Sequence, residues 1–284
     1  MPYTTLISAK TLYPLLSTPD YVIVDCRHDL AQPQAGRKAY QQAHIPGAYF
    51  LHLDDDLSGT KNGTNGRHPL PEVKNLNRTL SRCGIGPQTQ VIAYDDHGGM
   101  FAARLWWLLR WLGHTDAAVL DGGLTAWCAA GLPLSQEHPE QCEGKLDLQP
   151  VLTTVSTQQL LSSLDAEQQV IIDARATDRF QGQNETLDPV GGHIPGAINR
   201  FFKLNLNDDG TFKSAKELQQ EFQALLRDYD GRKVVHQCGS GVTACHNMLA
   251  MEIAGLGGSM LYPGSWSEWC SDPARPMVVG EDES

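Results

Sequence analysis

The chain has 284 residues, which is enough for about two domains of ordinary size. Apolar residues make up 41% and charged residues 19%, so a mainly disordered protein is excluded. The formal net charge is −11, from 22 basic and 33 acidic side chains, and nucleic acid is therefore not an expected partner. An anionic substrate would have to be bound by local groups, because the overall field repels it.

No stretch of the sequence predicts a membrane span. The most apolar stretch, residues 100–113, contains Arg104 and Arg110 and is shorter than the roughly 20 residues that cross a bilayer. The first residues lack the basic region and the apolar core of a signal peptide. We therefore expect a cytoplasmic protein with no membrane partner.

The seven cysteines argue against a disulfide framework. Their number is odd, their spacing is wide and no secretory signal precedes them. No Cys-x-x-Cys pair is present, so a structural zinc site is not expected either. Most of these thiols should be small buried hydrophobic side chains.

The chain repeats itself once. Three segments recur in the same order at a near-constant offset: residues 22–27 and 170–175, 43–48 and 192–197, and 120–127 and 261–269. Two copies of about 140 residues each predict a duplicated domain and not a solenoid. We expect domains at residues 1–140 and 151–284, with the boundary in the polar stretch 134–154.

Each half has the pattern of short buried strands that alternate with helices. Apolar, β-branched runs predict strands at 91–94 and 118–120 in the first half, and at 170–173, 233–237 and 260–262 in the second. A capping-box sequence begins a helix at Ser156, and further helices are predicted at 215–229 and 242–254. This order predicts an α/β fold of two tandem domains, each a mostly parallel sheet with helices on both faces.

The best candidate for a functional site follows the strand at 233–237, because sites in α/β sheets form at the carboxyl ends of strands. There the sequence reads Cys238-Gly-Ser-Gly-Val-Thr-Ala and continues as a helix. The two glycines allow a tight turn whose backbone N–H groups converge, and the helix N-terminus adds partial positive charge. Such a setting favours a nucleophilic thiolate at Cys238. A buried thiol before a glycine turn is the alternative.

This loop, both His-Ile-Pro-Gly-Ala segments, Asp-Ala-Arg after a strand and Gly-Ser-Trp-x-Glu-Trp near the end resemble the tandem-rhodanese sulfurtransferases. The likeness covers nearly the whole chain, and the loop itself is similar to that of 3-mercaptopyruvate sulfurtransferases. It implies two rhodanese-like domains that move a sulfane sulfur from 3-mercaptopyruvate, through a persulfide on Cys238, to a thiol, a thioredoxin-like protein or cyanide. No metal or organic cofactor is expected. Thiosulfate is the alternative donor. Thiosulfate-preferring members typically carry basic residues after the cysteine, and this loop has none.

The resemblance also implies roles for residues around Cys238. Arg179 would bind the donor carboxylate, a task that suits a guanidinium fork. His68 and Asp54 would work with Ser240 as a proton relay, with an ordinary polar loop as the alternative reading. The backbone N–H groups that would surround the transferred sulfur belong to residues Gly239, Ser240, Gly241, Val242, Thr243 and Ala244.

The chain differs from the family pattern at two places, and it also repeats several polar residues in both halves. Mercaptopyruvate-type enzymes usually hold a second Arg shortly before Gly-His-Ile-Pro, and residues 184–190 contain none, although Lys203 or Arg200 could substitute. In the first half Asp95 stands where Cys238 stands in the second. A carboxylate cannot carry a sulfane sulfur, so the first domain should be catalytically silent. His44 and His193, and the pairs Asp25–Arg27 and Asp173–Arg175, occur in both copies and are expected to be structural.

Two other functions compete with sulfur transfer. A cysteine phosphatase also places a cysteine in a backbone cradle, but it needs an arginine that closes the loop. Residues 243–246 are Thr, Ala, Cys and His, which makes phosphatase activity unexpected. A non-catalytic rhodanese-like binding module is the second alternative. It predicts loss of the loop thiol, and Cys238 is present.

Overall fold

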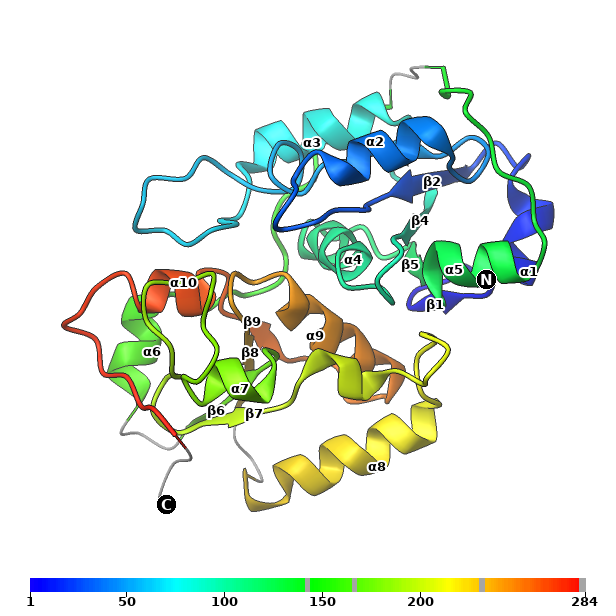
Figure 1. The fold of residues 1–284 in the computed structure, drawn as a ribbon. Coiled ribbons are helices and arrows are strands. Elements are labelled where there is room, and N and C mark those ends of the chain that lie inside the picture. Colours follow the sequence, from blue (N-terminus) through cyan, green and yellow to red (C-terminus); the bar gives the residue numbers. More distant parts are fainter. Residues whose placement is uncertain (141–143, 165–167, 230–232, 281–284) are drawn as a thin grey trace. The chain divides into compact units, whose positions relative to one another are not determined.

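The structure is a computed structural model that describes residues 1–140, 144–164, 168–229 and 233–280. The chain folds into two compact units (Figure 1). Unit 1 comprises Met1–Gly59, Pro71–Leu152 and Leu206–Phe212, and unit 2 comprises Thr60–Leu70, Thr153–Asn205 and Lys213–Ser284. A short segment from the first half of the sequence, Thr60–Leu70, is thus part of the unit that holds the Cys238 loop.

Unit 1 is built on a parallel sheet of five strands in the order β1-β5-β4-β2-β3. The strands are β1 (Leu6–Ile7), β2 (Tyr21–Asp25), β3 (Tyr49–Phe50), β4 (Gln90–Tyr94) and β5 (Ala117–Leu120). The helices are α1 (Ala9–Leu12), α2 (Ala35–Gln42), α3 (Val73–Arg82), α4 (Ala102–Trp111) and α5 (Gly123–Ala129), with a 3-10 turn η1 (Tyr13–Leu15). Apolar side chains of α1 and α5 share a buried cluster with Ile23 and Ile92, while α4 packs against β4 and β5.

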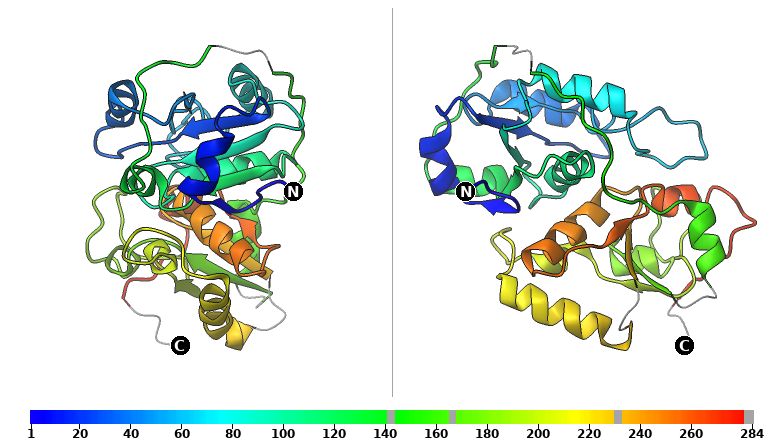
Figure 2. Two further views of the ribbon diagram at one scale, coloured as in Figure 1. Left: turned by 90° about the vertical axis from the view of Figure 1, so that its right-hand side faces the viewer. Right: turned by 180° about the vertical axis from the view of Figure 1, so that it is seen from behind.

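Unit 2 repeats this plan with four parallel strands in the order β7-β6-β8-β9. The strands are β6 (Gln169–Asp173), β7 (Ala197–Asn199), β8 (Lys233–Gln237) and β9 (Met260–Leu261). The helices are α6 (Thr157–Ser163), α7 (Thr177–Phe180), α8 (Ala215–Leu226), α9 (Thr243–Ile253) and α10 (Ser265–Trp269), with 3-10 turns η2 (Phe202–Asn205) and η3 (Arg227–Tyr229). Side chains of α6, α7 and α10 pack with Ile171 and Val235 in one cluster. The views of Figure 2 show α8 beside α9, and these two helices are in contact.

The α/β architecture predicted from the sequence is confirmed, with small differences in the bounds of elements. The capping box at Ser156 forms as predicted, since Gln159 N donates to Ser156 Oγ (3.3 Å) and Ser156 N donates to Gln159 Oε1 (2.8 Å). The helix expected at 215–229 is α8 followed by η3, so its last turn tightens into a 3-10 turn.

Buried ion pairs tie the repeated motifs to the sheets. In unit 1 Arg27 donates to Asp25 (2.7 Å) and to the carbonyl of Ala43 (2.7 Å). In unit 2 Arg175 makes the matching contacts with Asp173 (2.7 Å) and with the carbonyl of Gly192 (2.6 Å). Each guanidinium therefore joins the end of a central strand to the residue before a repeated histidine. The paired placement agrees with a structural role in both copies.

His236 in β8 makes the stability of unit 2 sensitive to acid. Its side chain is fully buried, 3.1 Å from Sδ of Met251, and burial lowers its pKa to about 3. In an unfolded chain a histidine titrates near about 6.5, so between these values the unfolded state binds the extra proton. The contribution of neutral His236 to stability is therefore complete above pH of about 6.5 and falls as the pH drops toward about 3.

We expect His236→Leu to lessen the fall of Tm between about pH 6.5 and pH 4, because leucine has no proton to take up on unfolding. Thermal unfolding followed by circular dichroism over this range measures the effect. An equally steep fall in both proteins would show that other groups cause it.

No helix among the described residues combines the length and apolar character that a membrane span requires. The described free thiols include five that are buried and one, Cys128, that is exposed. Cys142 lies outside the described residues.

Candidate active site

The Cys238 loop connects the end of β8 to the start of α9 and closes on itself tightly. Cys238 is buried, with 2% of its surface exposed. Gly241 has a φ of +76°, and a Cβ atom there would lie 2.5 Å from the carbonyl oxygen of Pro263. Only glycine meets both conditions at this position. The second glycine of the motif thus lets the loop pack directly against the segment before α10.

The start of α10 holds the loop backbone in place. Trp266 N donates to the carbonyl of Cys238 and Ser267 N to that of Gly239, both at 2.9 Å. Cys238 N in turn donates to Ser265 Oγ (3.1 Å). Ser265 has a φ of 54°, and among the described residues it is the one non-glycine residue with a positive φ. Its strained backbone is held by these contacts, which pre-organise the loop around the thiol.

Three of the four predicted catalytic residues lie together in unit 2. Ser240 N is 3.5 Å from Sγ of Cys238, and Ser240 Oγ is 2.7 Å from Nδ1 of His68. His68 reaches this place because the segment Thr60–Leu70 belongs to unit 2. Ser240 therefore contacts the candidate nucleophile through its backbone N–H and His68 through its hydroxyl.

The fourth residue, Asp54, belongs to unit 1. Its carboxylate lies 3.8 Å from Nε2 of His28, and its backbone N–H donates to Nδ1 of His52 (3.2 Å). Its part in a proton relay stays a prediction.

His28, His52 and Asp54 also bring three possible metal ligands within 4.8 Å of one another. The ring of His52 is already engaged on both sides. Its Nε2 lies 2.8 Å from the carbonyl of Pro33, and its Nδ1 accepts backbone hydrogen bonds from Asp54 and Asp55. We assign no metal to this cluster.

Arg179 lies beside the loop, where the resemblance places the binding group for the donor carboxylate. Its Nη2 and Nη1 are 3.7 and 3.8 Å from the position that a Cβ atom on Gly239 would take. The guanidinium also pairs with Glu185 (2.8 Å) and with Asp188 (3.4 Å). Burial would raise the pKa of Glu185, but the hydrogen bonds from Arg179 hold that pKa below its usual value. Arg179 is thus fixed by two carboxylates at the edge of the loop.

Sequence reasoning missed two charged residues of this region. Arg67 packs against Gly239 and pairs with Asp188 by a short hydrogen bond, while its backbone N–H donates to Ser267 Oγ (3.0 Å). Two sequence signals existed. Arg67 directly precedes His68, and Asp188 stands in the segment where a second arginine was sought.

The two substitutes suggested for that arginine are occupied elsewhere or exposed. Arg200 pairs with Glu221 of α8 (2.6 Å) and lies over the ring of Phe222. Lys203 is exposed on η2.

The loop of unit 1 that corresponds to the Cys238 loop encloses a carboxylate. Asp95 is fully buried and follows β4 as Cys238 follows β8. Its Oδ1 accepts hydrogen bonds from the backbone N–H groups of His97 (2.8 Å) and Gly99 (2.9 Å). Its Oδ2 accepts from Phe101 (2.7 Å) and Ala102 (2.9 Å). The backbone N–H groups of this loop therefore bind an anion, and that anion is the loop's own side chain. The sequence alone suggests a solvated acidic turn at Asp95, and its complete burial shows that this expectation is wrong.

We expect Asp95→Asn to destabilise the protein by about 2–4 kcal/mol, because an amide nitrogen would face two buried N–H donors. Urea unfolding measures this loss. Asp96→Asn is the matched control, since Asp96 is exposed and its pairing with His97 lies on the surface. Its expected effect is below about 1 kcal/mol. Equal effects of the two changes would contradict the cradle around Asp95.

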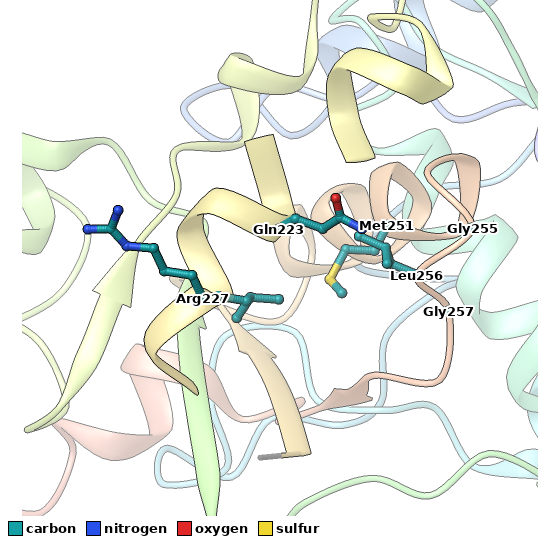
Figure 3. A pocket seen from close by; sticks show the side chains of 7 residues that line it. Gln223, Arg227, Met251, Gly255, Leu256 and Gly257 are labelled. Carbon is teal, nitrogen blue, oxygen red and sulfur yellow. The ribbon is translucent and has the colours of Figure 1, made fainter. Parts of the chain in front are cut away.

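Unit 2 also has a cavity of 570 Å³ between α8 and α9 (Figure 3). Its lining includes Gln223, Arg227, Met251 and Leu256, and Figure 3 shows the guanidinium of Arg227 directed away from the other labelled side chains. The lining residues contain no nucleophile and no acid–base pair. The Cys238 loop therefore stays the candidate active site.

Comparisons with known proteins identify the family of the chain. The rhodanese-like domain family matches residues 8–130 and again residues 156–272. A probable 3-mercaptopyruvate sulfurtransferase of Pseudomonas aeruginosa is 46% identical over 279 residues, covering 97% of this chain and 98% of the relative. A putative thiosulfate sulfurtransferase of Mycobacterium tuberculosis is 40% identical over 288 residues, with 97% of each chain covered.

Solved structures show the same likeness. The crystal structure of a 3-mercaptopyruvate sulfotransferase with the rhodanese fold from Escherichia coli superposes with a TM-score of 0.80 at 29% identity. The superposition covers 94% of this chain and 100% of that one. The duplicated sheet, the cysteine loop and these matches together show that the chain belongs to the rhodanese family of sulfurtransferases, with two rhodanese-like domains.

Proposed function

We propose that the protein transfers a sulfane sulfur from 3-mercaptopyruvate to an acceptor thiol or cyanide, with Cys238 as the sulfur carrier. The observation that carries the proposal is the contact line from Cys238 through Ser240 to His68. The backbone N–H of Ser240 contacts the thiol, and the hydroxyl of the same residue contacts an imidazole with which it can move a proton.

The reaction proceeds in two half-reactions. The Cys238 thiolate attacks the thiol sulfur of the donor, so an S–S bond forms as the C–S bond breaks. The electron pair of that bond leaves on the organic fragment as the enolate of pyruvate, which takes up one proton and departs as pyruvate. A thiolate or cyanide then takes the outer sulfur of the persulfide and restores the Cys238 thiolate.

The loop residues stabilise the charged species of this cycle. In the proposal, the backbone N–H groups of residues 239–244 surround the persulfide, much as the unit 1 loop surrounds the Asp95 carboxylate. Ser240, hydrogen bonded to His68, delivers the proton to the enolate, and Asp54 assists His68. Arg179 binds the donor carboxylate. None of these steps needs a metal or an organic cofactor.

A second candidate is supported for the identity of the sulfur donor. A relative at 40% identity is named a putative thiosulfate sulfurtransferase, so thiosulfate is the alternative donor. Residues 239–244 carry no charged side chain, which favours the singly charged mercaptopyruvate over the doubly charged thiosulfate. We further propose a thiol or thioredoxin-like acceptor, a cytoplasmic location, a silent domain at 1–140 and a catalytic domain at 151–284.

Mass spectrometry of the intact protein tests the central step. After incubation with 3-mercaptopyruvate and removal of the excess, the protein should gain one sulfur, and later addition of cyanide should remove it as thiocyanate. Peptide mapping should place the sulfur on the peptide that contains Cys238. A protein that gains no sulfur from either donor would contradict the proposal.

A further inference from the structure

Two guanidinium groups that come from distant parts of the chain lie against Gly239, the residue after the candidate nucleophile. A Cβ atom added to Gly239 would lie 2.7 Å from Nη2 of Arg67 and 3.8 Å from Nη1 of Arg179. Both guanidinium groups therefore pack on the backbone of the residue that follows Cys238. Arg67 is delivered by the segment Thr60–Leu70 and Arg179 by α7.

A buried carboxylate aims the two guanidinium groups. Asp188 accepts a short hydrogen bond from Nη1 of Arg67 at one oxygen and a bond of 3.4 Å from Nη2 of Arg179 at the other. Its side chain is only 2% exposed, whereas those of Arg67 and Arg179 are 27% and 20% exposed. The carboxylate is thus enclosed by protein, and the two cations keep one side open to small molecules.

Each guanidinium keeps at least one nitrogen for a further partner. Nη2 of Arg67 and Nη1 of Arg179 have no acceptor among the residues that the structure describes, and both lie next to Gly239. Two guanidinium nitrogens that meet at one place recognise a carboxylate well, because its two oxygens accept from both. The two remaining nitrogens lie beside the backbone of the residue after the nucleophile.

We infer that Arg67 binds the donor carboxylate together with Arg179, and that Asp188 is a positioning residue that aims both guanidinium groups. The inference rests on the proposed function and names the second cation that the segment before Gly192 lacks. Arg67 and Arg179 are balanced by Asp188 and Glu185, so this group of four has no net charge. A neutral group with two open donor nitrogens suits a single carboxylate better than a dianion.

Steady-state kinetics with two donors tests this inference. Mercaptoacetone keeps the thiol and the ketone of mercaptopyruvate but has a methyl group in place of the carboxylate. We expect Arg67→Gln to lower kcat/KM for mercaptopyruvate about tenfold or more, mainly through KM, and to change the value for mercaptoacetone less than about twofold. Arg67→Lys, which keeps the charge but loses the fork, should lie between Arg67→Gln and the wild type.

Asp188→Asn tests the positioning role by its effect on donor choice. It should lower kcat/KM for mercaptopyruvate but raise the ratio of thiosulfate to mercaptopyruvate activity severalfold, since one negative charge leaves the group. Arg227→Gln is the matched control, because Arg227 is exposed on η3 of the same unit. This change should leave kcat/KM unchanged for both donors.

The outcomes separate the inference from the proposed function. A wild-type protein that gains no sulfur from mercaptopyruvate would overturn the proposed function itself. If the wild type is active and Arg67→Gln lowers kcat/KM equally for both donors, or for neither donor, Arg67 does not bind the carboxylate. A loss with mercaptopyruvate alone cannot come from a damaged fold, because mercaptoacetone reports on the same thiol and the same loop.

Discussion

Cys238→Ser is expected to abolish sulfur transfer, by a factor of at least about 10⁴, and to leave the fold intact. A serine hydroxyl in this loop is not ionised at neutral pH and cannot form a persulfide, so both half-reactions lose their carrier. The backbone bonds that hold the loop, from Trp266 N and to Ser265 Oγ, do not involve the thiol. Thiocyanate production and the thermal unfolding curve measure the two parts of this prediction.

Cys128→Ser is the matched control for this change. Cys128 is an exposed thiol in unit 1, so its loss should alter neither transfer nor stability. Full activity of Cys238→Ser would refute the assignment of the nucleophile. A variant of Cys238 that is inactive and also unfolded would be replaced by Cys238→Ala, judged by the same two measurements.

The fold could be predicted from the sequence because its signals are local or repeated. The strand run ending at Asp25 recurs before Asp173, and both runs prove to be central parallel strands. The same holds for the cysteine loop, whose short sequence contains both the nucleophile and the glycine that its turn requires. Gly241 is needed there for its φ and for its contact with Pro263, which are properties of the turn itself.

The charged group formed by Arg67, Arg179 and Asp188 is harder to predict from the sequence, because it depends on contacts between residues far apart in the chain. Arg67 meets Gly239 only because the segment Thr60–Leu70 joins unit 2, and no local pattern signals such an exchange. Asp188 lies in the segment where mercaptopyruvate-type enzymes usually hold a second arginine. In the fold it is the anion that holds a cation supplied from elsewhere. The second arginine can thus be absent from its usual segment while another segment supplies an arginine to the same site.

We expect the wild type to prefer mercaptopyruvate over thiosulfate in kcat/KM, and Arg179→Ala to lower the value for mercaptopyruvate about 10²-fold. The loop itself offers a donor sulfur only backbone N–H groups and the start of α9, and the two guanidinium groups packed on Gly239 are balanced by Asp188 and Glu185, so a dianion meets little net positive charge. Mercaptopyruvate needs less charge at the sulfur, because its carboxylate is bound by Arg179 together with Arg67. Its carbonyl can accept a hydrogen bond from Ser240.

Removing Arg179 also leaves Glu185 without its closest partner, so Arg179→Lys should be measured beside the alanine variant. Lysine keeps the charge for Glu185 but presents no fork to the donor, and it should retain the fold while losing most of the preference for mercaptopyruvate. Initial rates with both donors, at one fixed cyanide concentration, give the comparison. A wild type that favours thiosulfate would show that loop charge does not decide the donor. If the wild type favours mercaptopyruvate but Arg179→Ala leaves kcat/KM for mercaptopyruvate unchanged, the assigned donor is correct. Arg179 is then not the group that binds its carboxylate.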